Sequence, residues 1–262
     1  MNLGICAWEL PMDVEGAFAF AKENEFANIS IEFDYAACKE DQAAWCEKIC
    51  ALVKEYDMPV SILALNVLCD IGMSLADKEE EVMDVVSLGI ETAAKIGAPA
   101  VHLPSFGQGA IVENAHLEQT IEILKKACAI GEELGVQVGH ESQLDEQDNE
   151  NIVFSIDSPA FYLLFDNENL ATEGIDPVET YCRFSRYIRH AHIKFGHFED
   201  ELKNLQAETR FGGIDAVFDV FRMGKFDGFL LLESPYNKEK IADGKTWQQV
   251  FEEDMAYLHS KI

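Results

Sequence analysis

The sequence predicts an α/β protein in which eight strand–helix units close into a (β/α)8 TIM barrel. Short runs rich in Val, Ile and Leu recur eight times, and a longer amphipathic stretch follows each run, as in parallel βα units. Division of the 262 residues by eight gives about 33 residues per unit, close to the size at which such barrels close. No Ser/Gly-rich linker interrupts the series, so we expect residues 1–262 to form a single barrel domain.

The eight units can be assigned in chain order. The expected strands lie at 3–8, 29–33, 60–66, 100–104, 136–141, 161–166, 188–194 and 228–233. The expected helices lie near 13–25, 41–56, 78–96, 115–134, 176–187, 214–224 and 246–259, with a short irregular piece near 148–156.

Local chemistry marks several boundaries. Gly97 and Gly135 each stand where a left-handed helix terminus precedes the next strand. Asp13 resembles a helix N-cap, and Asp176 followed by Pro177 is typical of a helix start. An open doubly wound sheet is the competing architecture, but no G-x-G-x-x-G loop follows the first strand.

The charge balance argues against two classes of partner. The chain has 20 Lys and Arg against 48 Asp and Glu, a net charge of −28, which repels nucleic acid and anionic lipid. The N-terminus lacks the basic and apolar regions of a signal peptide, and no apolar run is long enough to span a bilayer. Seven cysteines without a C-x-x-C pair suit reduced thiols. We therefore expect a cytoplasmic protein without nucleic-acid or membrane partners.

Acids and a histidine gather at the ends of strands five to eight. Glu141, Asp166 and Glu233 end strands five, six and eight, and strand seven presents His192. Each residue alone has a structural explanation, as a solvated charge, a helix cap or a buried histidine. Active sites of such barrels lie at the carboxyl ends of the strands, and adjacent strands are about 4.8 Å apart. The four side chains are therefore expected to converge.

A divalent cation would make this convergence stable. Three carboxylates in a water-poor site repel one another unless they take up protons or share a counter-charge. Three carboxylates and one imidazole suit one divalent metal ion, namely Mn²⁺, Mg²⁺, Co²⁺ or Zn²⁺. We predict that Glu141, Asp166, His192 and Glu233 are the ligands.

At these residues the sequence resembles the sugar phosphate isomerase/epimerase superfamily of xylose isomerase-like barrels. Ketose 3-epimerases, inosose dehydratases, hydroxypyruvate isomerases and endonuclease IV are members. The resemblance spans nearly the whole chain and rests on four short motifs in order. These are Val-Gln-Val-Gly-His-Glu at 136–141, Leu-Leu-Phe-Asp at 163–166, His-Ala-His-Ile-Lys at 190–194 and Gly-Phe-Leu-Leu-Leu-Glu at 228–233.

The resemblance implies that the four strand-end residues occupy the family's metal-ligand positions, and that Glu141 and Glu233 also serve as acid and base. Homo-oligomers are common in that family, so the resemblance also implies that this chain can form a homo-oligomer. Two positions depart from the family pattern. Many members carry a substrate-binding His where this chain has Asn169, and an acid after the strand-seven Lys where this chain has Phe195. These departures bear on the substrate more than on the metal.

The chemistry of such a site can be argued independently. An ion that binds a substrate's carbonyl and neighbouring hydroxyl stabilises the enediolate as charge develops on oxygen. Glu141 on one face and Glu233 on the other would then remove and return a proton, which inverts the carbon. Transfer on one face would instead give an isomerase. The expected substrate is a small ketose or related hydroxy-carbonyl compound.

Other residues near the same rim are candidates for substrate contacts, although each also has a structural explanation. Trp8 ends the first strand and is expected to stack on sugar C–H groups. Lys194 would hold a hydroxyl, carboxylate or phosphate. The full set of expected substrate contacts is Trp8, Glu32, Asn66, His102, Asn169, Lys194 and Arg210. The long stretch 195–213 exceeds a usual βα loop and is expected to form a lid.

The sequence leaves three alternatives. A metal-dependent dehydratase of a keto-inositol-like compound would use the same ion and base. A non-catalytic sugar-binding barrel would keep the fold without turnover. Endonuclease IV-like cleavage needs further His and Asp ligands, where this chain has Asn66, Asn169 and the pair Gly212–Gly213, and the net charge of −28 also opposes it.

Overall fold

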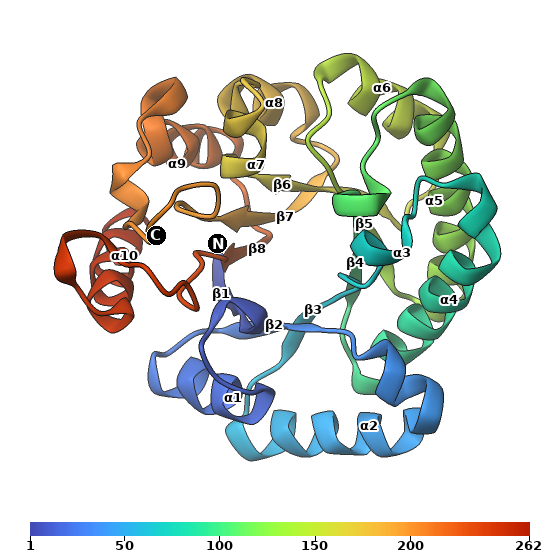
Figure 1. The fold of residues 1–262 in the computed structure, drawn as a ribbon, viewed down its shortest axis with the longest axis horizontal. Coiled ribbons are helices and arrows are strands. Elements are labelled where there is room, and N and C mark those ends of the chain that lie inside the picture. The colour runs from blue at the N-terminus through green and yellow to red at the C-terminus, as the bar shows by residue number, and fades with distance from the viewer.

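The computed structural model describes residues 1–262 and is a closed barrel of eight parallel strands (Figure 1). The strands follow one another in chain order around the barrel, and the last pairs in parallel with the first. The predicted (β/α)8 fold class is therefore confirmed. The strands are β1 (Asn2–Cys6), β2 (Asn28–Glu32), β3 (Val60–Ala64), β4 (Ala100–Pro104), β5 (Gln137–Glu141), β6 (Phe161–Asp166), β7 (Ile188–Ile193) and β8 (Phe229–Leu232).

Helices form an outer ring around the barrel (Figure 1). Eight of them fill the βα connections, and two short ones, α3 and α7, lie at the carboxyl ends of β3 and β6. None of the helices is both long and apolar enough to cross a membrane. The helices are α1 (Val14–Glu23), α2 (Tyr35–Tyr56), α3 (Leu68–Ile71), α4 (Glu79–Ile96), α5 (Asn114–Leu134), α6 (Glu146–Ser155), α7 (Asn167–Thr172), α8 (Pro177–Phe184), α9 (Gly213–Gly224) and α10 (Trp247–Lys261).

The predicted boundary signals act as expected. The Asp13 carboxylate accepts a hydrogen bond from a first-turn amide of α1. Gly97 and Gly135 end α4 and α5 with φ values of 77° and 71°, in the left-handed region that glycine adopts without strain. Asp176 caps α8, and Pro177 occupies its first turn.

Three expected elements need correction. The piece near 148–156 is a regular helix, α6, because Asp145 caps its first turn at Asp148. The second helix begins at Tyr35 rather than at 41, and non-helical angles at Asp41 divide it. The helix expected to reach 187 ends at Phe184. Apolar periodicity is weak in the first two segments, and capping decided where they begin.

A small apolar cluster fills the barrel interior below the carboxyl end. Gly139 makes room for it, since a Cβ there would lie 2.2 Å from the ring of Tyr162. The Tyr162 hydroxyl donates to the carbonyl of Val101 across the barrel. This cluster is a closed floor beneath the strand ends. Its buried members are Cys6, Ile62, Ala100, Tyr162, Leu164 and Leu231.

Candidate active site

Four side chains from successive strands meet at the carboxyl end of the barrel. Glu141 and Asp166 end β5 and β6, His192 lies one residue before the end of β7, and Glu233 directly follows β8. Asp166 and His192 are register partners, so their side chains project at the same height. One donor atom from each of the four residues lies within 4.8 Å of the others, and all four residues are buried. The structure thus brings the predicted quartet together.

The imidazole of His192 lies at the centre of this quartet. Its Nδ1 is 2.9 Å from Glu233 Oε2, 3.4 Å from Glu141 Oε1 and 3.9 Å from Asp166 Oδ2. Despite this proximity, His192 Nδ1 and Asp166 Oδ2 are buried without a hydrogen bond of acceptable geometry. Because buried polar atoms are almost always hydrogen-bonded, the two atoms retain the capacity to bind a further partner.

Lys194 supplies the one ammonium that contacts the quartet. Its Nζ lies 2.9 Å from Asp166 Oδ2 and 2.9 Å from Glu233 Oε2, and the residue is buried. Three carboxylates therefore face one ammonium and one imidazole. These donors fit a divalent cation of the oxygen- and nitrogen-preferring type.

Burial and neighbouring charges divide the three carboxylates into two kinds. Burial raises the pKa of Asp166 to about 8, with Lys194 acting in the opposite direction. Burial also opposes ionisation of Glu233, but His192 and Lys194 outweigh it and lower its pKa to about 2. His192 and His102 likewise outweigh burial at Glu141 and hold its pKa well below the usual range. Protonation of one acid relieves the repulsion among all three.

Each glutamate of the quartet is held by further neighbours. Asn169 Nδ2 donates to Glu141 Oε1 at 2.9 Å, and His102 Nε2 lies 2.6 Å from Glu141 Oε2. The indole N–H of Trp8 donates to Glu233 Oε1 at 3.1 Å. These contacts limit rotation of both carboxylates.

A cavity of about 420 Å³ lies above the quartet. This volume falls in the range of small-molecule sites. Two of the quartet, Glu141 and Glu233, line the cavity. The expected substrate contacts that also line it are Trp8, Asn66, His102, Asn169 and Lys194.

Two expected substrate contacts lie elsewhere. Glu32 is exposed at the end of β2 and lines a neighbouring cavity, shared with Trp8. Arg210 does not line the central cavity, and its guanidinium pairs with Glu208 and donates to Thr172. The expectation that Arg210 contacts a substrate here does not match this placement, because the long connection after β7 carries its own acidic partner for the guanidinium.

Sequence reasoning missed three polar residues of the cavity wall, namely Glu9, Gln143 and His197. Glu9 is 7% exposed and lies one position beyond Trp8. Burial and the nearby Glu233 raise the pKa of Glu9 to about 8. His197 lies across from it, with Nδ1 4.0 Å from Glu9 Oε1. Glu9 was within reach of the strand-end argument, but no periodicity marks the segment that contains His197.

The segment after β7 is fixed at both its amide and carbonyl groups. The buried carboxylate of Glu168 accepts hydrogen bonds from the N–H groups of Gly196, His197 and Phe198. The ammonium of Lys238 donates to the carbonyls of Gly196 and His197. His197 and Phe198 thereby form part of the cavity wall. The expected lid region begins with an anchored stretch, and 3₁₀ turns are its only helical elements.

The chain is similar to known proteins along most of its length. The model of the family described as "Xylose isomerase-like TIM barrel" matches residues 18–261. The chain belongs to this family. The resemblance inferred from the strand-end motifs is therefore confirmed.

One curated relative of this xylose isomerase-like barrel is an epimerase. It is the 2-epi-5-epi-valiolone 7-phosphate 2-epimerase of Actinoplanes sp., 32% identical over 127 residues. The match covers 48% of this chain and 46% of the relative, so the chain spans about half the length of the relative that it matches.

Solved structures extend the likeness over the full barrel. An L-ribulose 3-epimerase superposes with a TM-score of 0.80 at 16% identity, covering 99% of this chain and 93% of that one. A probable 3-DHS dehydratase from Bacillus anthracis superposes with a TM-score of 0.67 at 16% identity, covering 99% of both chains. At these identities the likeness shows the fold.

Proposed function

We propose that this xylose isomerase-like barrel is a divalent-metal-dependent epimerase or isomerase of a small keto sugar. The observation that carries the proposal is the pair Glu141 and Glu233. Both are buried and line one cavity beside His192. Asn169 donates to Glu141, whereas Trp8 and Lys194 donate to Glu233. The epimerase named among the relatives supports the same reaction class.

The proposed roles follow from these positions. Asp166 and His192, with the two glutamates, would hold the ion, which when bound stabilises negative charge on the substrate's carbonyl oxygen. Glu141, which is ionised, removes the proton from the carbon beside the carbonyl. Glu233 delivers to the opposite face a proton that it receives from the Lys194 ammonium, 2.9 Å from its Oε2. The contacts of Asn169 and Trp8 keep the two carboxylates aimed at that carbon. Positioned acid–base groups of this kind contribute about 10²–10⁴ in rate.

The charges around the cavity favour an uncharged substrate. Lys194 is engaged by Asp166 and Glu233, Lys238 by backbone carbonyls, and Arg210 by its own acidic partner. A phosphate entering the cavity would meet carboxylates before any unpaired Lys or Arg. We therefore propose an unphosphorylated keto sugar, unlike the phosphate in the name of the curated relative.

One observation favours dehydration as a second candidate. Loss of water requires an acid that protonates the departing hydroxyl. Glu9 faces the cavity, and its pKa of about 8 keeps a proton on the carboxyl near neutral pH. Dehydration would yield an unsaturated ketone with strong ultraviolet absorption, whereas epimerisation would not.

Proton exchange tests the proposed reaction. The Mn²⁺-loaded protein is incubated in D₂O with a panel of ketohexoses and keto glycosides, and deuterium uptake is followed by NMR. Wild type is expected to exchange a C–H beside the carbonyl, and Glu141→Gln or Glu233→Gln to slow exchange by about 10²–10⁴. Glu239→Gln, at an exposed position, is the control. Absence of exchange with every panel member, or wild-type rates in both variants, would refute the proposal.

Metal content tests the quartet separately. Elemental mass spectrometry after Mn²⁺ loading is expected to find close to one ion per wild-type chain, because the donor set fits a divalent ion. The double variant Asp166→Asn, His192→Ala should lose it, whereas Glu239→Gln should retain it. Equal metal content in wild type and the double variant would contradict the assignment of ligands.

A further inference from the structure

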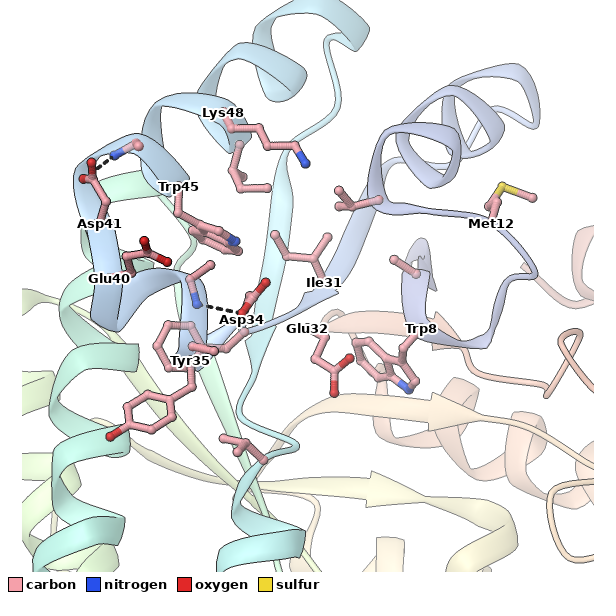
Figure 2. Close-up of a pocket in the computed structure, with 18 residues that line it drawn as sticks. Trp8, Met12, Ile31, Glu32, Asp34, Tyr35, Glu40, Asp41, Trp45 and Lys48 are labelled. Carbon is pink, nitrogen blue, oxygen red and sulfur yellow. Dashed lines mark hydrogen bonds between the residues drawn. The ribbon is translucent and has the colours of Figure 1, made fainter.

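A second cavity adjoins the central one, between α1, α2 and the end of β2 (Figure 2). We call this cavity the groove. Its volume is about 910 Å³, and 13 of its 18 lining residues are hydrophobic. This composition distinguishes it from the polar central cavity, of which only 4 of 15 lining residues are hydrophobic.

Aromatic side chains form much of the groove wall. Trp45 faces into it from α2, opposite Trp8 and Glu32 (Figure 2). Phe33 packs edge-on against Trp45, with ring centroids 6.3 Å apart. The break in α2 contributes to this wall, since Tyr35 before it and Trp45 after it both line the groove. Flat apolar surfaces of this kind suit an aromatic or alicyclic group.

The groove and the central cavity share part of their walls. Trp8 lines both of them, and its indole N–H is bonded to Glu233. At a second point of contact, Asn66 lines the central cavity and the next residue, Val67, lines the groove. A molecule whose reacting carbon lies above Glu233 can therefore extend past Trp8 into the groove.

The charges of the groove exclude an anion. Its charged residues comprise four carboxylates and one ammonium. Two of the acids, Asp34 and Asp41, are used as caps for the two segments of α2. The remaining surface is apolar with an acidic edge, so the group that it would accept is uncharged. The charged residues are Glu32, Asp34, Glu40, Asp41 and Lys48.

We infer that the groove is an aglycone site, and that the substrate is a glycoside of a keto sugar with an aryl or similarly apolar aglycone. The inference rests on the proposed function. In a glycoside C1 is blocked, so the carbonyl lies on another ring carbon. One proton leaves the carbon beside that carbonyl, and one returns to its opposite face. The glycosidic bond is neither made nor broken, so the aglycone remains in the groove throughout.

Two glycosides that differ only in aglycone test this inference. The probes are p-nitrophenyl and methyl 3-keto-β-D-glucopyranoside, and the readouts are KM for deuterium exchange and Kd by calorimetry. Wild type is expected to show a KM for the aryl probe at least about tenfold below that for the methyl probe, the difference expected for burial of one aromatic group.

Groove variants separate this site from the central cavity. Ala44 lines the groove and is exposed, so Ala44→Trp is expected to fill the space. It should raise the KM of the aryl probe about tenfold and leave that of the methyl probe unchanged, with Ala44→Ser as the matched control. Trp45→Ala should act in the same direction, with Phe154→Ala, at a residue 65% exposed, as its control.

The outcomes distinguish failure of the inference from failure of the proposed function. Equal KM values for the two probes in wild type, or an equal rise for both in Ala44→Trp, would overturn the aglycone site. If neither probe exchanges deuterium, the proposed reaction fails, and the aryl-selective loss of binding in Ala44→Trp still decides the groove. If Ala44→Trp differs from wild type in oligomeric state on size-exclusion chromatography but binds the aryl probe equally well, the groove belongs to an interface with a second copy of the chain. That result would overturn the inference.

Discussion

At the scale of single residues, burial rather than residue type decides which acids stay charged. Asp254 is fully buried in α10, where it accepts hydrogen bonds from the Leu205 amide and the Tyr236 hydroxyl. Burial raises its pKa from 3.8 to about 7, and those two bonds act in the opposite direction. The protonated acid is therefore the form that the folded state favours.

This raised pKa predicts a pH-dependent contribution to stability. Because the folded pKa exceeds the unfolded one, the contribution is complete below about pH 4 and is lost as the pH rises to about 7. The unfolding free energy of wild type minus that of Asp254→Asn should fall across this window and then level off. Urea unfolding from pH 4 to pH 8 measures it, with the exposed Glu252→Gln as control. A difference that grows with pH would contradict the assignment.

At the scale of elements, a connection can be rigid without regular structure. Three amides after β7 converge on the carboxylate of Glu168, and carbonyls of the same stretch converge on Lys238. Hydrogen bonds to charged groups contribute about 1.5–3 kcal/mol each. Glu168 and Lys238 thus satisfy backbone groups that a helix or strand would pair with each other. They also hold His197 on the cavity wall.

Removal of either anchor should loosen this stretch locally. In Glu168→Gln one acceptor oxygen becomes an NH₂ group facing amide donors. We expect the amides of Gly196, His197 and Phe198 to exchange with solvent at least about tenfold faster, equivalent to about 1.4 kcal/mol. Lys238→Met should have a similar effect. Hydrogen exchange with mass spectrometry measures it. Lys240→Met is the matched control, and protection equal to wild type in both anchor variants would show that the anchors are dispensable.

At the scale of the whole molecule, net charge opposes compactness. With 48 acids against 20 Lys and Arg, self-repulsion acts over the whole surface and is screened by salt. The Debye length falls from about 30 Å at 0.01 M to about 8 Å at 0.15 M salt. The melting temperature is therefore expected to rise over this range.

Calorimetry at several NaCl concentrations measures this salt dependence. A variant that reverses the charge of the exposed Glu80, Glu80→Lys, should show a weaker dependence than wild type, whereas Glu80→Gln should fall between the two. A melting temperature that does not change with salt, or that falls, would show that local ion pairs outweigh the net charge.

Much of the barrel follows from the sequence for a simple reason. Alternation of apolar runs with amphipathic stretches forces parallel strands inside and helices outside, and parallel strands bring their carboxyl ends to one rim. That geometry alone predicted that four side chains meet at one point, namely those of Glu141, Asp166, His192 and Glu233. The roles proposed for these four residues remain predictions, whereas their convergence is a property of the fold.

What the sequence by itself determined was the fold class, the strand order and the four strand-end residues, because strand periodicity and strand-end position are local patterns. Only the tertiary structure decided the partners of each charge. It paired Arg210 with Glu208, placed Lys194 between Asp166 and Glu233, and opened a groove beside Trp8. These outcomes depend on contacts between residues far apart in the chain, and burial sets the charge of an acid only after the chain has folded around it.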